Sequence, residues 1–160
     1  MTPRTDHKAF QYADIRRLSP GDVDDFHAFL TTFADAFGEP GTYLSAPPSA
    51  AYRDALLADP HFVALVAQRK RVVVGALAAY ELKKFERERS EFYIYDLAVA
   101  EPHRRKGVAT ALIEVLKDIA RSCGGYVLFV QADHGDDAAI ALYAKSGTRE
   151  DVLHFDIKPD

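Results

Sequence analysis

Hydrophobic and polar positions follow two different periods along the chain, one typical of helices and the other of strands. Apolar residues recur at helical spacing from Phe26 to Phe37, directly after the turn-forming run 19–22. Two short β-prone runs, 62–67 and 72–80, flank a polar turn and predict a β-hairpin. The first half of the chain therefore predicts both helices and strands.

The second half alternates strands with helices. The aromatic and β-branched run 92–99 is long enough for a central strand. A helix follows Pro102, with one apolar face over 109–123, and a strand over 126–130 comes next. Because a strand, a crossover helix and a second strand normally give parallel neighbours, we predict one parallel pair inside an otherwise antiparallel sheet.

The other expected elements are shorter. Turn-forming residues at 38–41 and 45–49 predict a flexible stretch. The remaining elements are a first strand over 9–18, a helix capped by Ser49 that ends before Pro60, an Ala-rich helix over 136–146 and a last strand over 152–157. The order βααβββαβαβ predicts an α+β fold, with a mixed, mostly antiparallel sheet flanked by helices.

Composition narrows the class of protein. The chain has 160 residues, of which 48% are hydrophobic and 28% charged, so we expect one globular domain spanning residues 1–160. A formal net charge of −4 argues against a general nucleic-acid binder. The N-terminus has no apolar run typical of a signal peptide, and no membrane-spanning run occurs in the sequence. We therefore expect a cytoplasmic protein that does not bind membranes.

A basic loop marks the first candidate site. Arg104-Arg105-Lys106 precedes Gly107 where a strand is expected to pass into a helix. A helix N-terminus presents unpaired backbone N–H groups, and a glycine lets a ligand approach the backbone, so the segment suits a pyrophosphate. The alternative is a basic loop whose glycine is incidental. Neither GxGxxG nor GxxxxGK[ST] occurs, which leaves dinucleotide and P-loop sites without support.

Two segments resemble signatures of the GCN5-related N-acetyltransferase (GNAT) superfamily. The run 104–109 resembles its R/Q-x-x-G-x-G/A coenzyme A loop, and Ala139 with 142–147 resembles its second signature. Segments 74–80, 93–99, 130–137 and 154–157 are similar to the type I aminoglycoside 3-N-acetyltransferases. Two positions depart from the superfamily pattern, since Ala109 replaces a common glycine and Asp136 replaces an asparagine that contacts the cofactor.

The resemblance implies a GNAT fold and an activity. It implies transfer of the acetyl group of acetyl-CoA to the 3-amino group of aminoglycosides such as gentamicin, and hence antibiotic resistance. It also implies a homodimer. Two alternatives stay open. One is the same chemistry on another polyamine or a protein amine, and the other is a non-catalytic module that binds coenzyme A.

Acetyl transfer to an amine needs a group that takes the amine's proton and a group that protonates the departing thiolate. Asp96 interrupts an apolar strand, where a carboxylate needs a partner, and is our candidate base. A structural Asp at a strand irregularity is the alternative. Tyr143 is the candidate acid because its Leu-Tyr context matches the second signature, although helical spacing alone would make it a core tyrosine.

The resemblance and the residue types also suggest ligand contacts. For the cofactor we expect Leu97, Ala98, Val99, Arg104, Arg105, Lys106, Gly107, Val108, Ala109, Thr110, Asp136, Ala139 and Tyr143. For a polycationic substrate we expect Glu39, Tyr43, Asp96, Asp133, Asp137 and Asp156. Individually, the loop carboxylates could equally be solvated acids, and Asp136 could be a helix N-cap. We expect no metal, and we place Cys123 in the core rather than at a reactive site.

Overall fold

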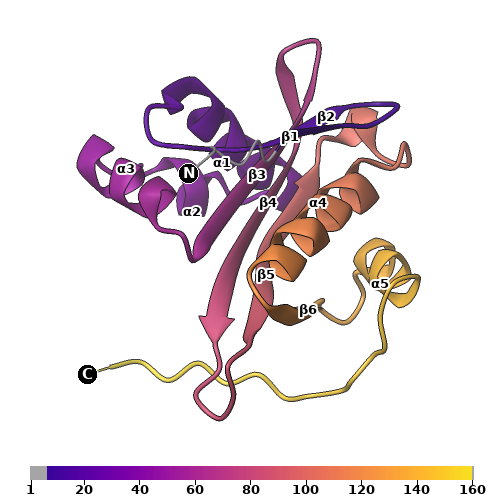
Figure 1. The fold of residues 1–160 in the computed structure, drawn as a ribbon. Helices are drawn as coiled ribbons and strands as arrows, with labels where there is room; N and C mark the ends of the chain where they lie inside the picture. The colour runs from indigo at the N-terminus through magenta and orange to yellow at the C-terminus, as the bar shows by residue number, and fades with distance from the viewer. Residues whose placement is uncertain (1–6, 160) are drawn as a thin grey trace.

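The computed structural model describes residues 7–159, and its centre is one six-stranded sheet in the order β1 to β6 (Figure 1). The strands are β1 His7–Ala9, β2 Asp14–Arg17, β3 Phe62–Arg69, β4 Val72–Lys83, β5 Ser90–Val99 and β6 Gly125–Val130. All neighbours pair antiparallel except β5 and β6, which pair parallel. The predicted α+β fold with a single parallel pair is confirmed.

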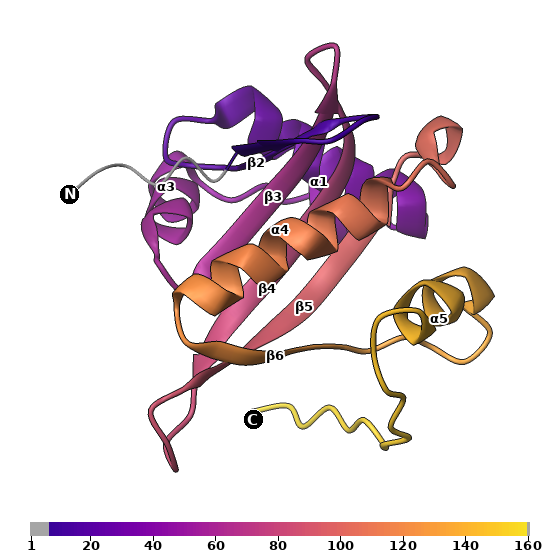
Figure 2. The same ribbon diagram turned by 45° about the vertical axis from the view of Figure 1, so that its right-hand side comes forward.

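Helices cover both faces of the sheet. They are α1 Val23–Phe37, α2 Pro40–Leu44, α3 Ala50–Ala58, α4 Val108–Ser122 and α5 Asp137–Ala144, with a short 3₁₀ helix, η1, over Glu101–His103. The first three lie on one side, whereas α4 and α5 lie on the other (Figure 2). Ser49 caps α3 as predicted, because its hydroxyl accepts a hydrogen bond from the Tyr52 N–H at 3.2 Å.

Each face of the sheet has its own hydrophobic cluster. The α4 side buries Phe92, Leu112 and Leu116, and the α1 side buries Phe29 and Phe33. Strands β3 and β4 belong to both clusters, so their middle residues are buried on both faces despite the antiparallel pairing. This explains why the two runs are almost continuously apolar and lack an inside-outside alternation.

Gly75 on β4 allows the start of α4 to approach the sheet closely, next to the predicted loop. A Cβ added to Gly75 on β4 would lie 2.8 Å from Cγ1 of Val108, the first residue of α4. Such a distance is too short for a carbon–carbon contact, so only glycine lets the start of α4 sit directly on the sheet. The position of the basic loop therefore depends on a residue about thirty positions away in sequence.

Several local predictions need correction. The expected strand over 9–18 is two strands, because a turn closed by the Phe10 N–H to Ala13 O bond at 3.2 Å divides it. Within the expected flexible stretch, residues Pro40–Leu44 form α2, with Pro40 at its start. Cys123 is exposed and not in the core, since it is the C-cap residue that follows the end of α4 at Ser122.

The largest difference from prediction is at the C-terminal end. Residues 152–157 do not form the predicted last strand, and 148–159 contain no regular element. The segment runs extended and exposed past the sheet (Figure 1). Separately, no helix within residues 7–159 is long and apolar enough to cross a membrane.

Candidate active site

A β-bulge decides where Asp96 points. On β5 the pairing with β4 passes from Ile94, opposite Ala79, to Asp96, opposite Ala78, so Tyr95 is an extra residue. Side chains alternate along a strand, and one inserted residue exchanges the two faces. Without the bulge Asp96 would share the face of Ile94, within the core under α4. With it, the carboxylate lies on the α1 side of the sheet.

Tyr43 is the hydrogen-bond partner of this carboxylate. Its hydroxyl donates to Asp96 Oδ2 at 2.9 Å, although the two residues are 53 positions apart. Burial raises the pKa of Asp96 above its ordinary value, the Tyr43 hydrogen bond lowers it, and nearby Glu39 raises it further. The pKa of Tyr43 is itself raised, first by burial and then by the hydrogen bond to Asp96. The hydroxyl is therefore a fixed donor.

An apolar cavity of about 210 Å³ opens beside this pair. Asp96 is the one charged residue among those that line it. The other lining residues are Phe26, Phe29, Leu30, Phe33, Tyr43, Pro48, Leu56, Phe62, Ala78, Tyr80 and Tyr95. A lone carboxylate in an aromatic wall suits a cation, because the charge and the ring faces both attract it.

The predicted basic loop lies at the carboxyl end of the same strand. Gly107 has φ of 80° and is the N-cap of α4, and apart from the local backbone around it no heavy atom of residues 7–159 lies within 4 Å of where its Cβ would be. Space above the first turn of α4 is therefore open, and the glycine offers no side chain to cap the N–H groups there. Arg104 Nε donates to Val99 O at 3.0 Å, and Lys106 Nζ donates to Pro102 O at 3.0 Å, which ties both cations to the loop.

Strands β5 and β6 separate beyond Ile94. Their parallel pairing ends at Ile94 and Val130, whereas β5 continues to Val99. On the β6 side, the backbone from Tyr95 to Val99 therefore has no strand beside it in the described part of the chain. The predicted backbone donors Leu97, Ala98 and Val99 lie in this stretch, directly before the basic loop. The open edge and the loop together fit an extended anionic ligand.

Helix α5 supplies the other predicted catalytic side chain. Tyr143 is half-buried against the cluster under α4, and burial is the main reason that its pKa is raised to about 12. The carboxylates of Asp136 and Asp96 raise it further. Asp136 caps α5 and accepts a hydrogen bond from the Ala139 N–H at 3.1 Å, so the N-cap alternative describes its main contact.

The predicted substrate carboxylates divide into three places. Glu39 precedes α2 and is close enough to Asp96 to raise its pKa. Asp133, between β6 and α5, and Asp137, the first residue of α5, are both exposed. Asp156 lies on the extended C-terminal segment, where its carboxylate contacts His154 Nε2 at 3.0 Å and its side chain is 91% exposed. The structure brings Glu39, Tyr43 and Asp96 together, and Asp156 stays apart from them.

Sequence reasoning missed the aromatic part of the site. Tyr80 and Tyr95 line the cavity with their ring centroids 6.0 Å apart, and Tyr95 is 62% exposed. The sequence does show tyrosines in both predicted strands, but only the pairing register of β4 with β5 shows that Tyr80 and Tyr95 are neighbours. No group of three metal-ligating side chains occurs in residues 7–159 that could hold an ion.

Comparison with known families decides the relationship. A model of the acetyltransferase (GNAT) family matches residues 26–148. The chain belongs to this family. The match includes the Asp96 bulge, the basic loop and Tyr143, and GNAT enzymes use acetyl-CoA as co-substrate. The rat protein N-acetyltransferase 8B (Rattus norvegicus) is 28% identical over 90 residues, which cover 56% of this chain and 40% of that protein. The matched part thus spans less than half of this curated relative.

Solved structures give a fuller match. An aminoglycoside acetyltransferase from an uncultured soil metagenomic sample is 53% identical with a TM-score of 0.91, and the match covers 94% of this chain and 100% of that one. A second such enzyme, solved in complex with sisomicin, is 30% identical with a TM-score of 0.83, over 93% and 97% of the two chains. The described fold is therefore similar to theirs over nearly its whole length.

Proposed function

We propose that this protein transfers the acetyl group of acetyl-CoA directly to an amine of an aminoglycoside, in the cytoplasm. The observation that carries the proposal is the half-buried Asp96, the one carboxylate in an aromatic cavity, on the strand that leads into the basic loop. The soil enzyme of 53% identity supports an aminoglycoside as the substrate. When bound, acetyl-CoA supplies an activated thioester, and the residues of this chain supply binding and proton transfer.

Asp96 accepts the proton of the substrate ammonium in this proposal, directly or through one water. Tyr43 holds Oδ2 by its hydrogen bond, which leaves Oδ1 to face the amine. The raised pKa of Asp96 suits the role, since a carboxylate of higher pKa is a stronger base. Glu39, close to the pair, adds negative charge that attracts a further ammonium group.

Tyr143 donates a proton to the departing thiolate. With its pKa raised to about 12, the phenol stays protonated throughout the neutral range and is available as a donor. Its position on α5 lies on the α4 side of the sheet, whereas Asp96 lies on the α1 side. The pairing of β5 with β6 ends at Ile94 and Val130. In this proposal the reacting thioester lies beyond that point, and the base and the acid approach it from opposite directions.

The cofactor contacts in this proposal lie along the unpaired end of β5, beyond Ile94, and at the start of α4. The N–H groups at the start of α4, over Val108 to Thr110, would bind the pyrophosphate with Arg105 beside them. Backbone groups of Leu97 to Val99 would hold the thioester carbonyl, and Ala139 on α5 would lie beside the thiol arm. Asp136 would also lie beside the cofactor, because it is the N-cap residue of α5. Its side chain already accepts the capping hydrogen bond from the Ala139 N–H.

Regiochemistry and biological role rest on the sequence resemblance. Segments 74–80 and 93–99, which resemble the type I 3-N-acetyltransferases, form the cavity wall and the Asp96 strand. We therefore propose the 3-amino group of gentamicin-like compounds as the acceptor, and resistance as the consequence. Asp133 and Asp137 are the remaining carboxylates available to bind substrate ammonium groups.

One observation favours a second candidate substrate class. The cavity beside Asp96 is mostly apolar and aromatic, which suits the methylene chain of an alkyl polyamine as well as a sugar ring. Spermidine is therefore the natural competitor. A protein amine would be tested by a lysine peptide.

The deciding experiment is a parallel assay of free coenzyme A release from acetyl-CoA with gentamicin, spermidine and a lysine peptide. We expect turnover on gentamicin, one added acetyl group by mass spectrometry, and its location on the 3-amino nitrogen by NMR. Turnover on spermidine or the peptide alone would overturn the aminoglycoside substrate. Binding of acetyl-CoA without turnover on any amine would favour a non-catalytic module.

A further inference from the structure

Tyr12 contacts the basic loop from a distant part of the chain. It lies in the turn between β1 and β2. Its hydroxyl shares a hydrogen bond of 2.8 Å with Nδ1 of His103, the last residue of η1 and 91 positions away. Lys106 Nζ lies 5.2 Å from the centroid of the same ring, within the range of a cation–π contact. One side chain therefore meets the loop at two points.

Arg69 holds Tyr12 itself in place. This last residue of β3 lies over the Tyr12 ring, with Cζ 4.1 Å from the ring centroid, and its Nη1 donates to the Tyr12 carbonyl oxygen at 3.1 Å. Strand pairing brings the two residues together, because Asp14 on β2 lies opposite Gln68 on β3. The Tyr12 ring also packs against the hydrophobic cluster under α4. Both the backbone and the ring of Tyr12 are thus anchored to the sheet.

The loop between the two contacts has a strained backbone. Arg105 has φ of 61°, in the left-handed region that residues other than glycine rarely adopt. Such a conformation persists only where surrounding contacts fix it. The consecutive cations Arg104, Arg105 and Lys106 also repel one another before an anion binds. The contacts of Tyr12 at His103 and Lys106 lie on either side of Arg105, so they fix both ends of the strained stretch.

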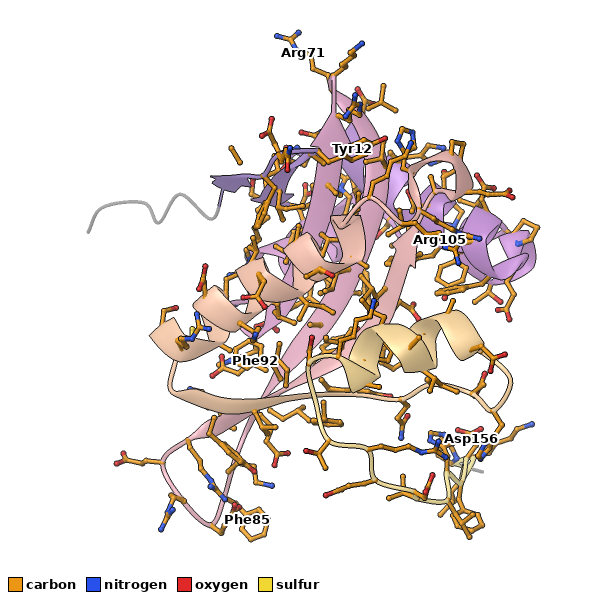
Figure 3. The ribbon with its side chains drawn as sticks, turned by 90° about the vertical axis from the view of Figure 1, so that its right-hand side faces the viewer. Tyr12, Arg71, Phe85, Phe92, Arg105 and Asp156 are labelled. Atoms are coloured by element: carbon orange, nitrogen blue, oxygen red, sulfur yellow. The ribbon has the colours of Figure 1, made fainter. Side chains whose placement is uncertain are left out.

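Arg105 is the cation that the loop leaves available. Arg104 and Lys106 already donate to main-chain oxygens. The Arg105 guanidinium makes no hydrogen bond or ion pair with another side chain or carbonyl of residues 7–159. Figure 3 shows Tyr12 between Arg71, at the tip of the β3–β4 hairpin, and Arg105. The residue that anchors the loop therefore lies next to the cation best placed to meet an anion.

We propose that Tyr12 is a positioning residue for the cofactor. From its anchor on the sheet it holds residues 103–107 in the binding conformation before acetyl-CoA arrives. Arg105 and the first turn of α4 then meet the pyrophosphate without first becoming ordered. Preorganisation of this kind strengthens binding, because less conformational entropy is lost at the binding step. This role rests on the cofactor part of the proposed function and does not depend on which amine is acetylated.

Tyr12→Phe is the first test, with coenzyme A affinity measured by calorimetry on the full chain. The variant keeps the ring, and with it the contacts of Arg69 and Lys106, but loses the bond to His103. We expect coenzyme A to bind about 3–10-fold more weakly, whereas kcat at saturating acetyl-CoA and the KM for the amine stay unchanged. A purely structural role would lower the melting temperature without changing this affinity, and that result would overturn the proposal. Tyr52→Phe, at an exposed position of α3, should bind coenzyme A as the wild type does.

Variants of His103 test whether the effect passes through the hydrogen bond. His103→Leu should weaken coenzyme A binding by a similar factor, and its combination with Tyr12→Phe should be no weaker than either single variant, because both remove the same bond. His103→Asn should keep most of the affinity, since its amide can reach the position of Nδ1. Equal losses in the two His103 variants, or additive losses in the double variant, would overturn the proposal. A wild type that does not bind coenzyme A would overturn the cofactor part of the proposed function as well.

Discussion

Two regions of this molecule differ in how many of their side chains are buried. Around α1, β3, β4 and α4, the helices bury large side chains on both faces of the sheet, among them Phe33, Leu77 and Leu112. Around β6, α5 and the C-terminal segment, none of the described residues is buried. The first region can hold the acceptor side of the site rigidly. The second region carries Tyr143 and has no buried side chains of its own to hold that residue in place.

This difference has a physical basis. Local opening of a protein is least costly where few apolar contacts must be broken. The Tyr43–Asp96 pair is anchored on the well-packed side, since Tyr43 packs against Phe33, which is 1% exposed. Helix α5 contributes only half-buried residues to the core. We infer that cofactor binding completes the second region, and four predictions test the contrast.

The largest expected effect is loss of turnover in Asp96→Asn. We expect a decrease of roughly 10²–10⁴-fold, because the amide cannot accept the ammonium proton, with acetyl-CoA affinity unchanged by calorimetry. Burial raises the pKa of Asp96, so ionisation opposes folding as the pH rises through that pKa, and the variant should be no less stable at neutral pH. Asp35→Asn, on an exposed position of α1, is the control. Wild-type turnover in Asp96→Asn would remove the base assignment.

A matched pair of leucines measures the contrast in packing. Leu112→Ala, at a fully buried position of α4, should lower the free energy of unfolding by about 2–5 kcal/mol. Leu142→Ala, at a half-buried position of α5, should lower it by about 1 kcal/mol or less. Urea denaturation of the apo protein gives both values. Equal losses at the two positions would mean that α5 is packed as firmly as α4.

Tyr143→Phe tests chemistry in the less buried region. The variant keeps the ring and its packing but loses the proton donor, so we expect kcat to fall about 100-fold with little change in KM for the amine. Because the pKa of Tyr143 is raised to about 12, wild-type kcat should show no alkaline decline near the ordinary phenol value of 10.0. Tyr52→Phe, at an exposed position, should behave as wild type. An unchanged kcat in Tyr143→Phe would contradict the donor role.

The smallest expected effect belongs to Tyr43→Phe. Its hydrogen bond lowers the pKa of Asp96, so removing it should raise that pKa and move the acid limb of kcat/KM to higher pH. We expect a loss of about 10-fold on the acid side and a smaller loss above the limb. Steady-state rates across the pH range measure it. A uniform loss at every pH would indicate a packing role only.

Much of the fold could be predicted because its signals are local. The phenylalanines of α1 and the apolar face of α4 recur at helical spacing, and the β3–β4 hairpin has two apolar runs around a polar turn. The parallel pair followed from the crossover through α4. The prediction of the last strand was wrong because a strand forms only where a neighbouring strand can pair with it. Segment 152–157 has the right alternation, but no strand within residues 7–159 pairs with it.

The site could be predicted only in part. The loop at Gly107 was identifiable because its cations and glycine are consecutive. The cavity was not, since Tyr43, Tyr80 and Tyr95 meet only through the packing of α2 against α1 and the register of β4 with β5. Cys123 was misplaced because helical periodicity was extended one residue past the end of α4.

The sequence alone determined the element types, the parallel crossover and the basic loop before α4, because each depends on residues near one another in the chain. The tertiary structure decided the face on which Asp96 lies, its bond with Tyr43 and the open edge of β6. The bulge at Tyr95 explains the difference. One extra residue in the pairing reverses the faces of a strand, and strand register is set by the neighbouring strand rather than by the sequence of the strand itself.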